Sequence, residues 1–149
     1  MARAESETGV QQIALTERPA KAPDSEKITI NLGHVDLGQI DLLVQERFYS
    51  NRTDFIRTAI RTQLERHADV VKRSVEVHQL DLGLRNYARQ DLETARAAGQ
   101  MLHIQVLGLA IIDPDVSAEL ALATIASVHV LGALQASADV KAALGRRIR

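Results

Sequence analysis

The chain has 149 residues, of which 18 are basic and 19 acidic, so its formal net charge is −1. A protein that bound nucleic acid over most of its surface would be strongly basic, so any DNA contact must be a local patch. The lack of cysteine excludes disulfides, thiol catalysis and thiolate zinc sites, and the two Phe, two Tyr and no Trp leave too few aromatic platforms for single-stranded nucleic acid.

Residues 1–25 are predicted to form a disordered arm. They mix acidic and basic residues, include Pro19 and Pro23, and offer only the short Ile13–Leu15 stretch to bury. Neither the arm nor any later segment has the continuous apolar stretch of a signal peptide or a membrane span. We therefore expect a cytoplasmic, nucleoid-associated protein with no membrane partner.

The segment 27–32 alternates polar and apolar residues, which is the period-two pattern of a half-buried strand. Its residues are Lys27, Ile28, Thr29, Ile30, Asn31 and Leu32. A first helix is expected directly after it. Asp36 with Gln39 has the spacing of a capping box, and Val35 with Ile40 has the spacing of a hydrophobic staple.

A turn and a second helix follow. Ser50 or Asn51 is placed to cap this helix, and apolar residues recur at helical spacing from Phe55 to Leu64, with arginines off that stripe. One strand and two helices are too few to close a core alone. The missing half must therefore come from a second copy of the chain.

The stretch from Lys27 to Arg66 resembles the ribbon-helix-helix DNA-binding family of the CopG, Arc and MetJ type. The resemblance covers roughly residues 26–68, and its most specific part is the turn with the helix after it. It implies that strands from two subunits pair in antiparallel orientation and enter the major groove of double-stranded DNA. The implied base-contacting residues are Lys27, Thr29 and Asn31. The implied phosphate-contacting residues, at a helix N-terminus, are Ser50, Asn51 and Arg52.

Residues 67–73 keep helical spacing and are expected to prolong the second helix, after which a repeat begins. Within residues 75–144, Val106–Gly108 recurs as Val130–Gly132 and Asp115 recurs as Asp139, each 24 positions later. A weaker first copy lies 24 positions earlier, where Leu82 matches Val106. One strand and one helix fit a unit of this length, which predicts a short αβ solenoid-like repeat of period 24.

The expected strands lie near residues 80–84, 102–109 and 127–134, and each is followed by a helix opened by an aspartate. These aspartates are Asp91, Asp115 and Asp139. Strands joined by helices must run parallel, and the recurring Gly108 and Gly132 are expected to permit close packing. The predicted class is α+β, with a ribbon-helix-helix domain at 26–74 and a strand-helix repeat domain at 75–149.

The repeat strands are apolar on both faces: Ile104 and Val106 lie on one side, and Leu107 and Leu109 on the other. The repeat's own helices are expected to cover one face and a second subunit the other. The basic tail at 145–149 is expected to be too short to cover the last strand edge. We predict a homodimer through the N-terminal strand and a higher homo-oligomer through residues 75–149; the alternative is a self-contained domain with a two-sided core.

No catalytic residue, metal ligand or cofactor is predicted, so the chain is not expected to be an enzyme. The five histidines show no i, i+4 pair, and His103 and His129 are interpreted as strand-end or core residues. Asp113 and Asp115 belong to an Asp-Pro-Asp turn, which explains them without acid–base chemistry.

The sequence predicts a sequence-specific DNA-binding transcriptional regulator, a repressor, that acts as an intertwined dimer with a C-terminal self-association domain. One alternative is a self-assembling scaffold that uses the ribbon-helix-helix fold only to dimerise, since the outward residues of the strand include a single cation, Lys27. An antitoxin-type regulator is a further alternative. It is disfavoured because residues 101–144 are apolar and patterned, unlike a segment that folds only on binding.

Overall fold

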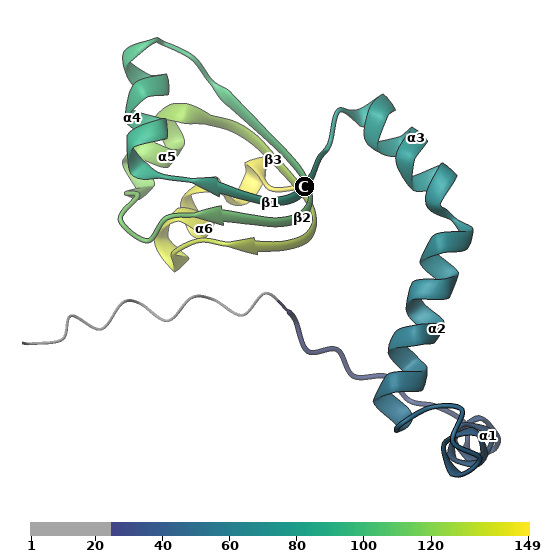
Figure 1. Ribbon diagram of the computed structural model, residues 1–149. Coiled ribbons are helices and arrows are strands. Elements are labelled where there is room, and N and C mark those ends of the chain that lie inside the picture. Colours follow the sequence, from purple (N-terminus) through teal and green to yellow (C-terminus); the bar gives the residue numbers. More distant parts are fainter. Residues whose placement is uncertain (1–24) are drawn as a thin grey trace, which may run out of the picture.

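The computed structural model describes residues 25–149, so all but the last residue of the arm predicted at 1–25 lies outside the described residues. The elements, in chain order, are α1 (His34–Gln45), α2 (Arg52–Arg66), α3 (Ala68–His78), β1 (Asp81–Tyr87), α4 (Arg89–Ala97), β2 (Leu102–Ile112), α5 (Ala118–Thr124), β3 (Ile125–Gln135), α6 (Ala138–Leu144) and a 3₁₀ turn, η1 (Gly145–Arg147). Figure 1 shows a helical part, α1 to α3, and a part in which α4 to α6 accompany the sheet. The predicted α+β class is confirmed.

Helix α1 begins three residues earlier than its sequence predicts. Gly33 is the N-cap, with an extended backbone (φ −64°, ψ 152°), and no side chain caps the helix. The prediction of a capping box at Asp36 and Gln39 is therefore wrong. Asp36 lies instead in the first turn, where its negative charge interacts favourably with the positive end of the helix dipole. Val35 is 73% exposed, so the predicted staple with Ile40 is not formed either.

Helices α2 and α3 form one long bent rod (Figure 1). His67 is both the C-cap of α2 and the N-cap of α3, and its amide donates to the Leu64 carbonyl, one residue short of helical spacing. The chain therefore stays helical beyond Arg66, as expected, but with a break. Because α3 continues to His78, it runs through residue 75, where the sequence predicts a domain boundary.

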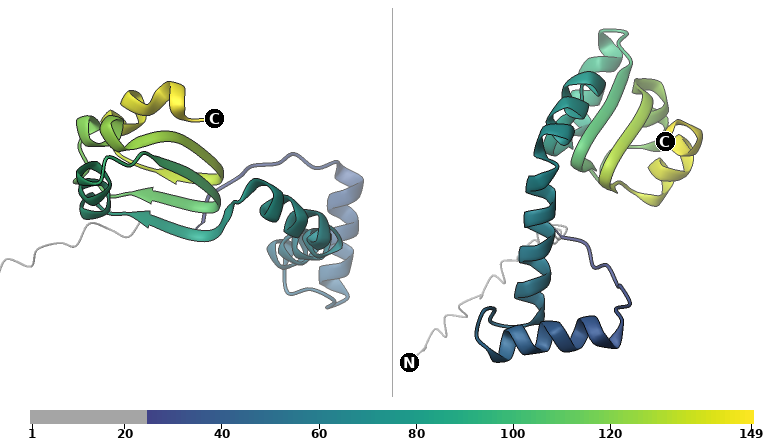
Figure 2. Two further views of the ribbon diagram at one scale, coloured as in Figure 1. Left: turned by 90° about the horizontal axis from the view of Figure 1, so that it is seen from above. Right: turned by 90° about the vertical axis from the view of Figure 1, so that its right-hand side faces the viewer.

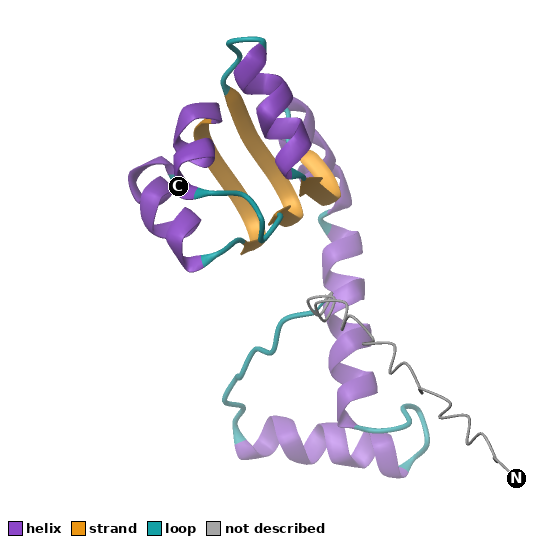
Figure 3. Cartoon of the chain, turned by 90° about the vertical axis from the view of Figure 1, so that its left-hand side faces the viewer, coloured by secondary structure: helices purple, strands orange, loops and turns teal. Residues whose placement is uncertain are grey.

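The three strands form one sheet in the order β1-β2-β3, and both pairs are parallel, as expected. Along β2 the even-numbered residues Ile104, Val106, Ala110 and Ile112 are buried, whereas Leu107 and Leu109 are only partly buried. The buried strand residues join a core with apolar residues of the three accompanying helices. These helix residues are Leu92 from α4, Leu120 and Ala121 from α5, and Val140 and Leu144 from α6. Figure 3 shows these helices beside the strands.

Three glycines lie side by side across the sheet. Gly83 pairs with Gly108, and Gly108 with Gly132, and their φ angles are 108°, 138° and 127°. A Cβ on Gly108 would overlap the carbonyl oxygen of Gly83 and lie 3.0 Å from its carbonyl carbon, and Gly132 meets Gly108 in the same way. The expected close packing at Gly108 and Gly132 is thus confirmed. Figures 1 and 2 show β2 and β3 folding back sharply on themselves at one end of the sheet.

The sheet corrects the predicted alignment of the first strand. Leu82 pairs with Leu107, not with Val106, so this strand is shifted by one residue from the 24-residue match. The apolar residues of β1 match β2 about equally well in either register. The glycines decide between them, because only Gly tolerates both the positive φ and the close backbone approach.

None of the three predicted aspartates is the N-cap residue of its helix. Ser117 and Ser137 cap α5 and α6, and their hydroxyl oxygens accept from the amides of Leu120 (3.1 Å) and Val140 (3.2 Å). A serine hydroxyl is as good a cap as a carboxylate, and both serines stand where the chain is still extended. Asp91 does act at the start of α4, where its carboxylate accepts from the Ala88 amide at 3.0 Å.

The C-terminal tail covers part of the β3 edge, contrary to prediction. The turn η1 reverses the chain, so that Ile148 forms a parallel bridge with Val128 and the Arg149 amide donates to the Val128 carbonyl at 2.9 Å. The Arg147 guanidinium donates to two carbonyl oxygens, of Leu122 (2.7 Å) and Ile125 (2.6 Å). The five residues of the tail are enough to reach the β3 edge because the tight 3₁₀ turn changes the direction of the chain within three residues.

Candidate nucleic-acid interface

The segment that carries the predicted base-contacting residues is extended but is not a strand in the single chain. Residues 26–33 have no regular secondary structure, and Lys27, Thr29 and Asn31 are exposed. Its apolar residues are uncovered as well, since Ile28 is 74% and Ile30 58% exposed. The predicted strand is not formed because no described segment lies beside it to exchange ladder hydrogen bonds.

Helices α1 and α2 pack against each other with little burial. In these two helices Ile40 is the only buried residue. Large apolar side chains are exposed to solvent on both helices and on the turn between them. They are Leu42 (55% exposed), Phe48 (72%), Ile60 (47%) and Leu64 (60%). The turn is fixed by an edge-to-face contact of Tyr49 and Phe55, with ring centroids 5.0 Å apart.

The start of α2 is held by reciprocal hydrogen bonds. The Asn51 side-chain oxygen accepts from the Asp54 amide, and the Asp54 carboxylate accepts from the Ser50 amide, both at 2.9 Å. Asn51 is thus the N-cap, one of the two residues predicted for this role. Helical geometry leaves the amides of Arg52 and Thr53 without intrahelical partners. They are the donors available to an anion at this end of the helix.

Arg52 is engaged within the chain. Its Nε and Nη2 atoms donate to the two carboxylate oxygens of Asp41, both at 2.6 Å, and so tie α2 to α1. These hydrogen bonds lower the pKa of Asp41 and raise the pKa of Arg52, and the opposite charges add to both shifts. Both side chains remain about half exposed, so solvent screens the pair. Asp41 had no local sequence signal, because its partner lies 11 residues away across a turn.

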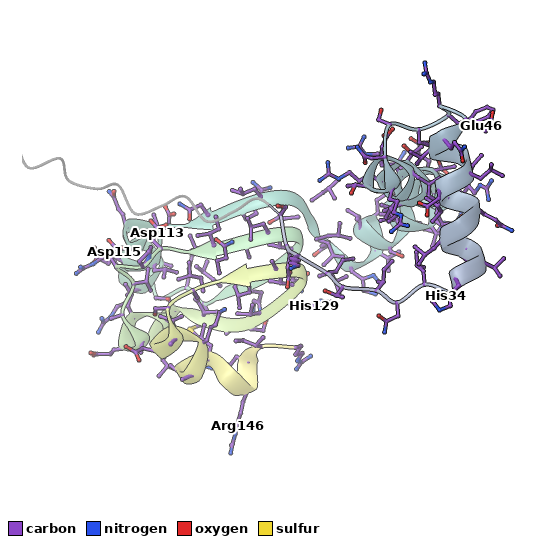
Figure 4. The ribbon with its side chains drawn as sticks, turned by 90° about the horizontal axis from the view of Figure 1, so that it is seen from below. His34, Glu46, Asp113, Asp115, His129 and Arg146 are labelled. Carbon is purple, nitrogen blue, oxygen red and sulfur yellow. The ribbon has the colours of Figure 1, made fainter. Side chains whose placement is uncertain are left out.

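The two predicted groups of DNA-contacting residues stand at different ends of α1. Figure 4 labels His34 and Glu46 at the two ends of this helix. Lys27, Thr29 and Asn31 precede the first end, and Ser50 to Arg52 follow the second. Figure 2 shows α1 lying across the end of α2. The structure therefore groups the residues within each set but does not bring the two sets together in one chain.

The remaining polar candidates do not converge on a reactive site. His103 Nδ1 lies 2.8 Å from the Ser127 hydroxyl on the neighbouring strand. Asp113 and Asp115 lie at a turn far from His129 (Figure 4), and the Asp113 amide donates to the Tyr87 carbonyl. Within residues 25–149, no three His, Asp or Glu residues are grouped so as to hold a metal ion. The helices of this same range also include none long and apolar enough to cross a membrane.

Comparison with known protein families gives a match over most of the chain. Residues 23–141 match the model of the ribbon-helix-helix transcriptional regulator family. The match confirms the resemblance seen at residues 26–68 and extends through the sheet into α6, a part that the sequence alone did not assign to a family. No curated protein and no solved structure matches the chain significantly.

Proposed function

Because the chain belongs to the ribbon-helix-helix transcriptional regulator family, we propose that it is a sequence-specific repressor that binds operator DNA as an intertwined dimer. Members of this family bind DNA as dimers. In this proposal the segments 27–32 of two copies pair in antiparallel orientation and enter the major groove of chromosomal DNA in the cytoplasm.

The single observation that carries this proposal is the uncovered apolar surface of the N-terminal part. Ile28 and Ile30 are more than half exposed, and α1 and α2 bury only Ile40. A unit of this size cannot keep such surface in water and remain folded. A second copy would cover the apolar side of the extended segment and leave its polar side, with Lys27, Thr29 and Asn31, facing outward.

The polar residues suit different parts of the recognition. Asn31 can pair with adenine and Thr29 with either kind of base pair, so they set sequence preference. Lys27 brings its charge to the bases, and Ser50, Asn51 and Arg52 contact phosphates at the helix end. These residues set overall affinity. The free amides of Arg52 and Thr53 are the donors that meet a phosphate at the start of α2.

A selection of binding sites from random double-stranded DNA tests the assignment of Asn31. We expect Asn31→Ala to change the enriched sequence and to leave the dimer intact, since each good base contact contributes about 1–3 kcal/mol. The matched control is Gln39→Ala, which removes an exposed amide from α1 outside the proposed interface. An unchanged preference for Asn31→Ala would remove this residue from base recognition.

A second function is favoured by one observation. The Arg52 guanidinium is held by Asp41, and Lys27 is the only cation in the extended segment, so little free positive charge faces the proposed DNA. This charge distribution suits a scaffold that keeps the ribbon for dimerisation only. A DNA affinity that falls steeply with salt concentration and is higher for one sequence would support the repressor and exclude the scaffold.

We also propose that the C-terminal part joins ribbon dimers into a larger assembly. Leu82, Leu84 and Leu131 on the strands are 67%, 53% and 49% exposed, so the sheet keeps apolar surface that its own helices do not cover. Two self-complementary contacts on one chain generate a tetramer if the symmetry closes. The mass in solution, measured over a range of concentrations, is expected to exceed that of a dimer.

A further inference from the structure

The sheet has one edge that is partly covered and one that is open. The C-terminal tail pairs with β3 at Val128. At the other edge, β1 pairs only with β2, and no other segment of residues 25–149 pairs with its outer side. All residues from Asp81 to Asn86 are exposed, and Leu82 and Leu84 reach 67% and 53%.

The open edge carries two charged residues, Asp81 and Arg85, but has no proline, lysine or covering segment to protect it. Edge strands are normally guarded by proline, by lysine or by a covering segment, because their free peptide groups are a template for another strand. β1 has the sequence DLGLRNY, which contains neither proline nor lysine and has two exposed leucines. Its positive φ at Gly83 restricts the choice of partner. An incoming strand must bend at the same place, and β1 of a second copy has that bend.

We propose that β1 pairs in antiparallel orientation with β1 of a second copy, around a two-fold axis that passes through Gly83. This inference rests on the proposed C-terminal self-association and identifies its surface. In this register Asp81 lies opposite Arg85 of the second copy, and Leu82 lies opposite Leu84 of the second copy. The charged residues then face residues of opposite charge, and the leucines face leucines.

The glycines provide a second argument. At Gly108 and Gly132, the space that a Cβ would fill is occupied by the carbonyl group of the preceding strand. Gly83 has the same positive φ, but no atom lies within 4 Å of the corresponding position. The backbone of a further strand can therefore approach Gly83 closely.

The charged residues of the edge are free to change partners. Arg85 and Asp81 form an ion pair within the chain at 3.1 Å, with side chains 54% and 51% exposed. Exchanging this contact for the equivalent one between copies buries no unpaired charge. A single seven-residue edge is small beside the roughly 800 Å² per partner of a stable interface. It is sufficient here because each ribbon dimer presents two such edges, which raises their effective concentration.

Charge substitutions at the edge test the proposal in the full-length protein. Asp81→Arg alone, or Arg85→Asp alone, places like charges opposite each other and is expected to weaken association about tenfold. At concentrations where the wild type is just assembled, each variant alone should therefore have mainly the mass of a ribbon dimer. An equal mixture of the two variants should regain the wild-type mass, because each substituted position then meets an opposite charge. Neither variant keeps the Asp81–Arg85 pair within its chain, so recovery can come only from contact between copies.

Two matched controls carry the same changes of charge elsewhere. Glu119→Arg on α5 and Lys141→Asp on α6 alter exposed positions away from β1 and should keep the wild-type mass, alone and mixed. Circular dichroism of every variant checks that the fold is intact. As an independent measurement, a mixture of Leu82→Cys and Leu84→Cys chains should form a disulfide between copies under oxidation, in a protein that has no cysteine of its own.

The outcomes separate this proposal from the broader one. A wild-type mass above a dimer supports self-association whatever the variants do. If Asp81→Arg and Arg85→Asp keep that mass, if their mixture does not recover it, or if the cysteine pair does not cross-link, the β1 edge is not the contact. Another occupant, such as residues 1–24 of the same chain, would give these negative results. A wild-type protein that stays dimeric overturns both proposals, while DNA binding by the dimer is measured separately.

Discussion

Replacing Gly108 by alanine tests the explanation of the sheet most sharply. Gly108 has a φ of 138°, which L-residues with a side chain rarely adopt, and its Cβ would overlap the carbonyl oxygen of Gly83. The backbone strain alone costs about 1–3 kcal/mol. Separating the two strands to make room adds about 1–3 kcal/mol, as in other overpacked cores. We therefore expect Gly108→Ala to reduce the free energy of unfolding by about 2–6 kcal/mol.

Two further glycines separate strain from overlap. Gly83 has a φ of 108° but an open space around its Cβ position within the chain, so in a protein that is not associated through β1 Gly83→Ala should cost only the strain, about 1–3 kcal/mol. Gly38 lies inside α1 with open space around it, so Gly38→Ala should stabilise the protein by about 0.5–1 kcal/mol.

The assay is urea unfolding followed by circular dichroism, at one fixed protomer concentration because oligomer stability depends on it. The expected order of stability is Gly38→Ala, wild type, Gly83→Ala and then Gly108→Ala. If Gly108→Ala were no less stable than Gly83→Ala, the close approach of the strands at Gly108 would be refuted.

Three further predictions concern the cap of α2, the ion pair between α1 and α2, and the C-terminal tail. Asn51→Ala should lower stability by about 1 kcal/mol in thermal unfolding, because the Asp54 amide loses its acceptor, and equal stability would exclude the cap. The folded-state pKa of Asp41 is lowered, so its pairing with Arg52 stabilises the fold above the ordinary aspartate pKa, and this stabilisation is lost as pH falls through the lowered value. Asp41→Asn should remove this loss of stability in acid from unfolding curves measured at several pH values. A curve unchanged by the substitution would contradict the pairing. Arg147→Ala should cost about 1–3 kcal/mol by leaving two carbonyl oxygens without their donor, and a neutral result in urea unfolding would show that water replaces the guanidinium.

The features that the sequence predicted correctly have local causes. Asn51 was one of two candidates for the cap of α2 because capping depends on residues within one turn. The parallel strands followed from their helical connections. Gly108 and Gly132 were expected to permit close packing because they recur with the strands.

The features that the sequence missed depend on distant or competing partners. The pair of Asp41 and Arg52 joins two helices across a turn, so no periodicity indicates it. Asp115 and Asp139 were chosen as caps over the neighbouring serines, although either residue type satisfies a helix N-terminus. The register of β1 was wrong by one residue because apolar matching ignores the steric demand of the glycines.

Binding to double-stranded DNA at several salt concentrations tests the central claim most directly. The titration uses an operator enriched from random sequence and, for comparison, bulk genomic fragments. For a ribbon dimer that contacts phosphates, the logarithm of the affinity should fall linearly with the logarithm of the salt concentration, by about 0.9 per phosphate neutralised. The operator should also bind more tightly than bulk DNA at every salt concentration. An affinity that does not change with salt, together with no sequence enriched over bulk, would contradict a DNA-binding regulator.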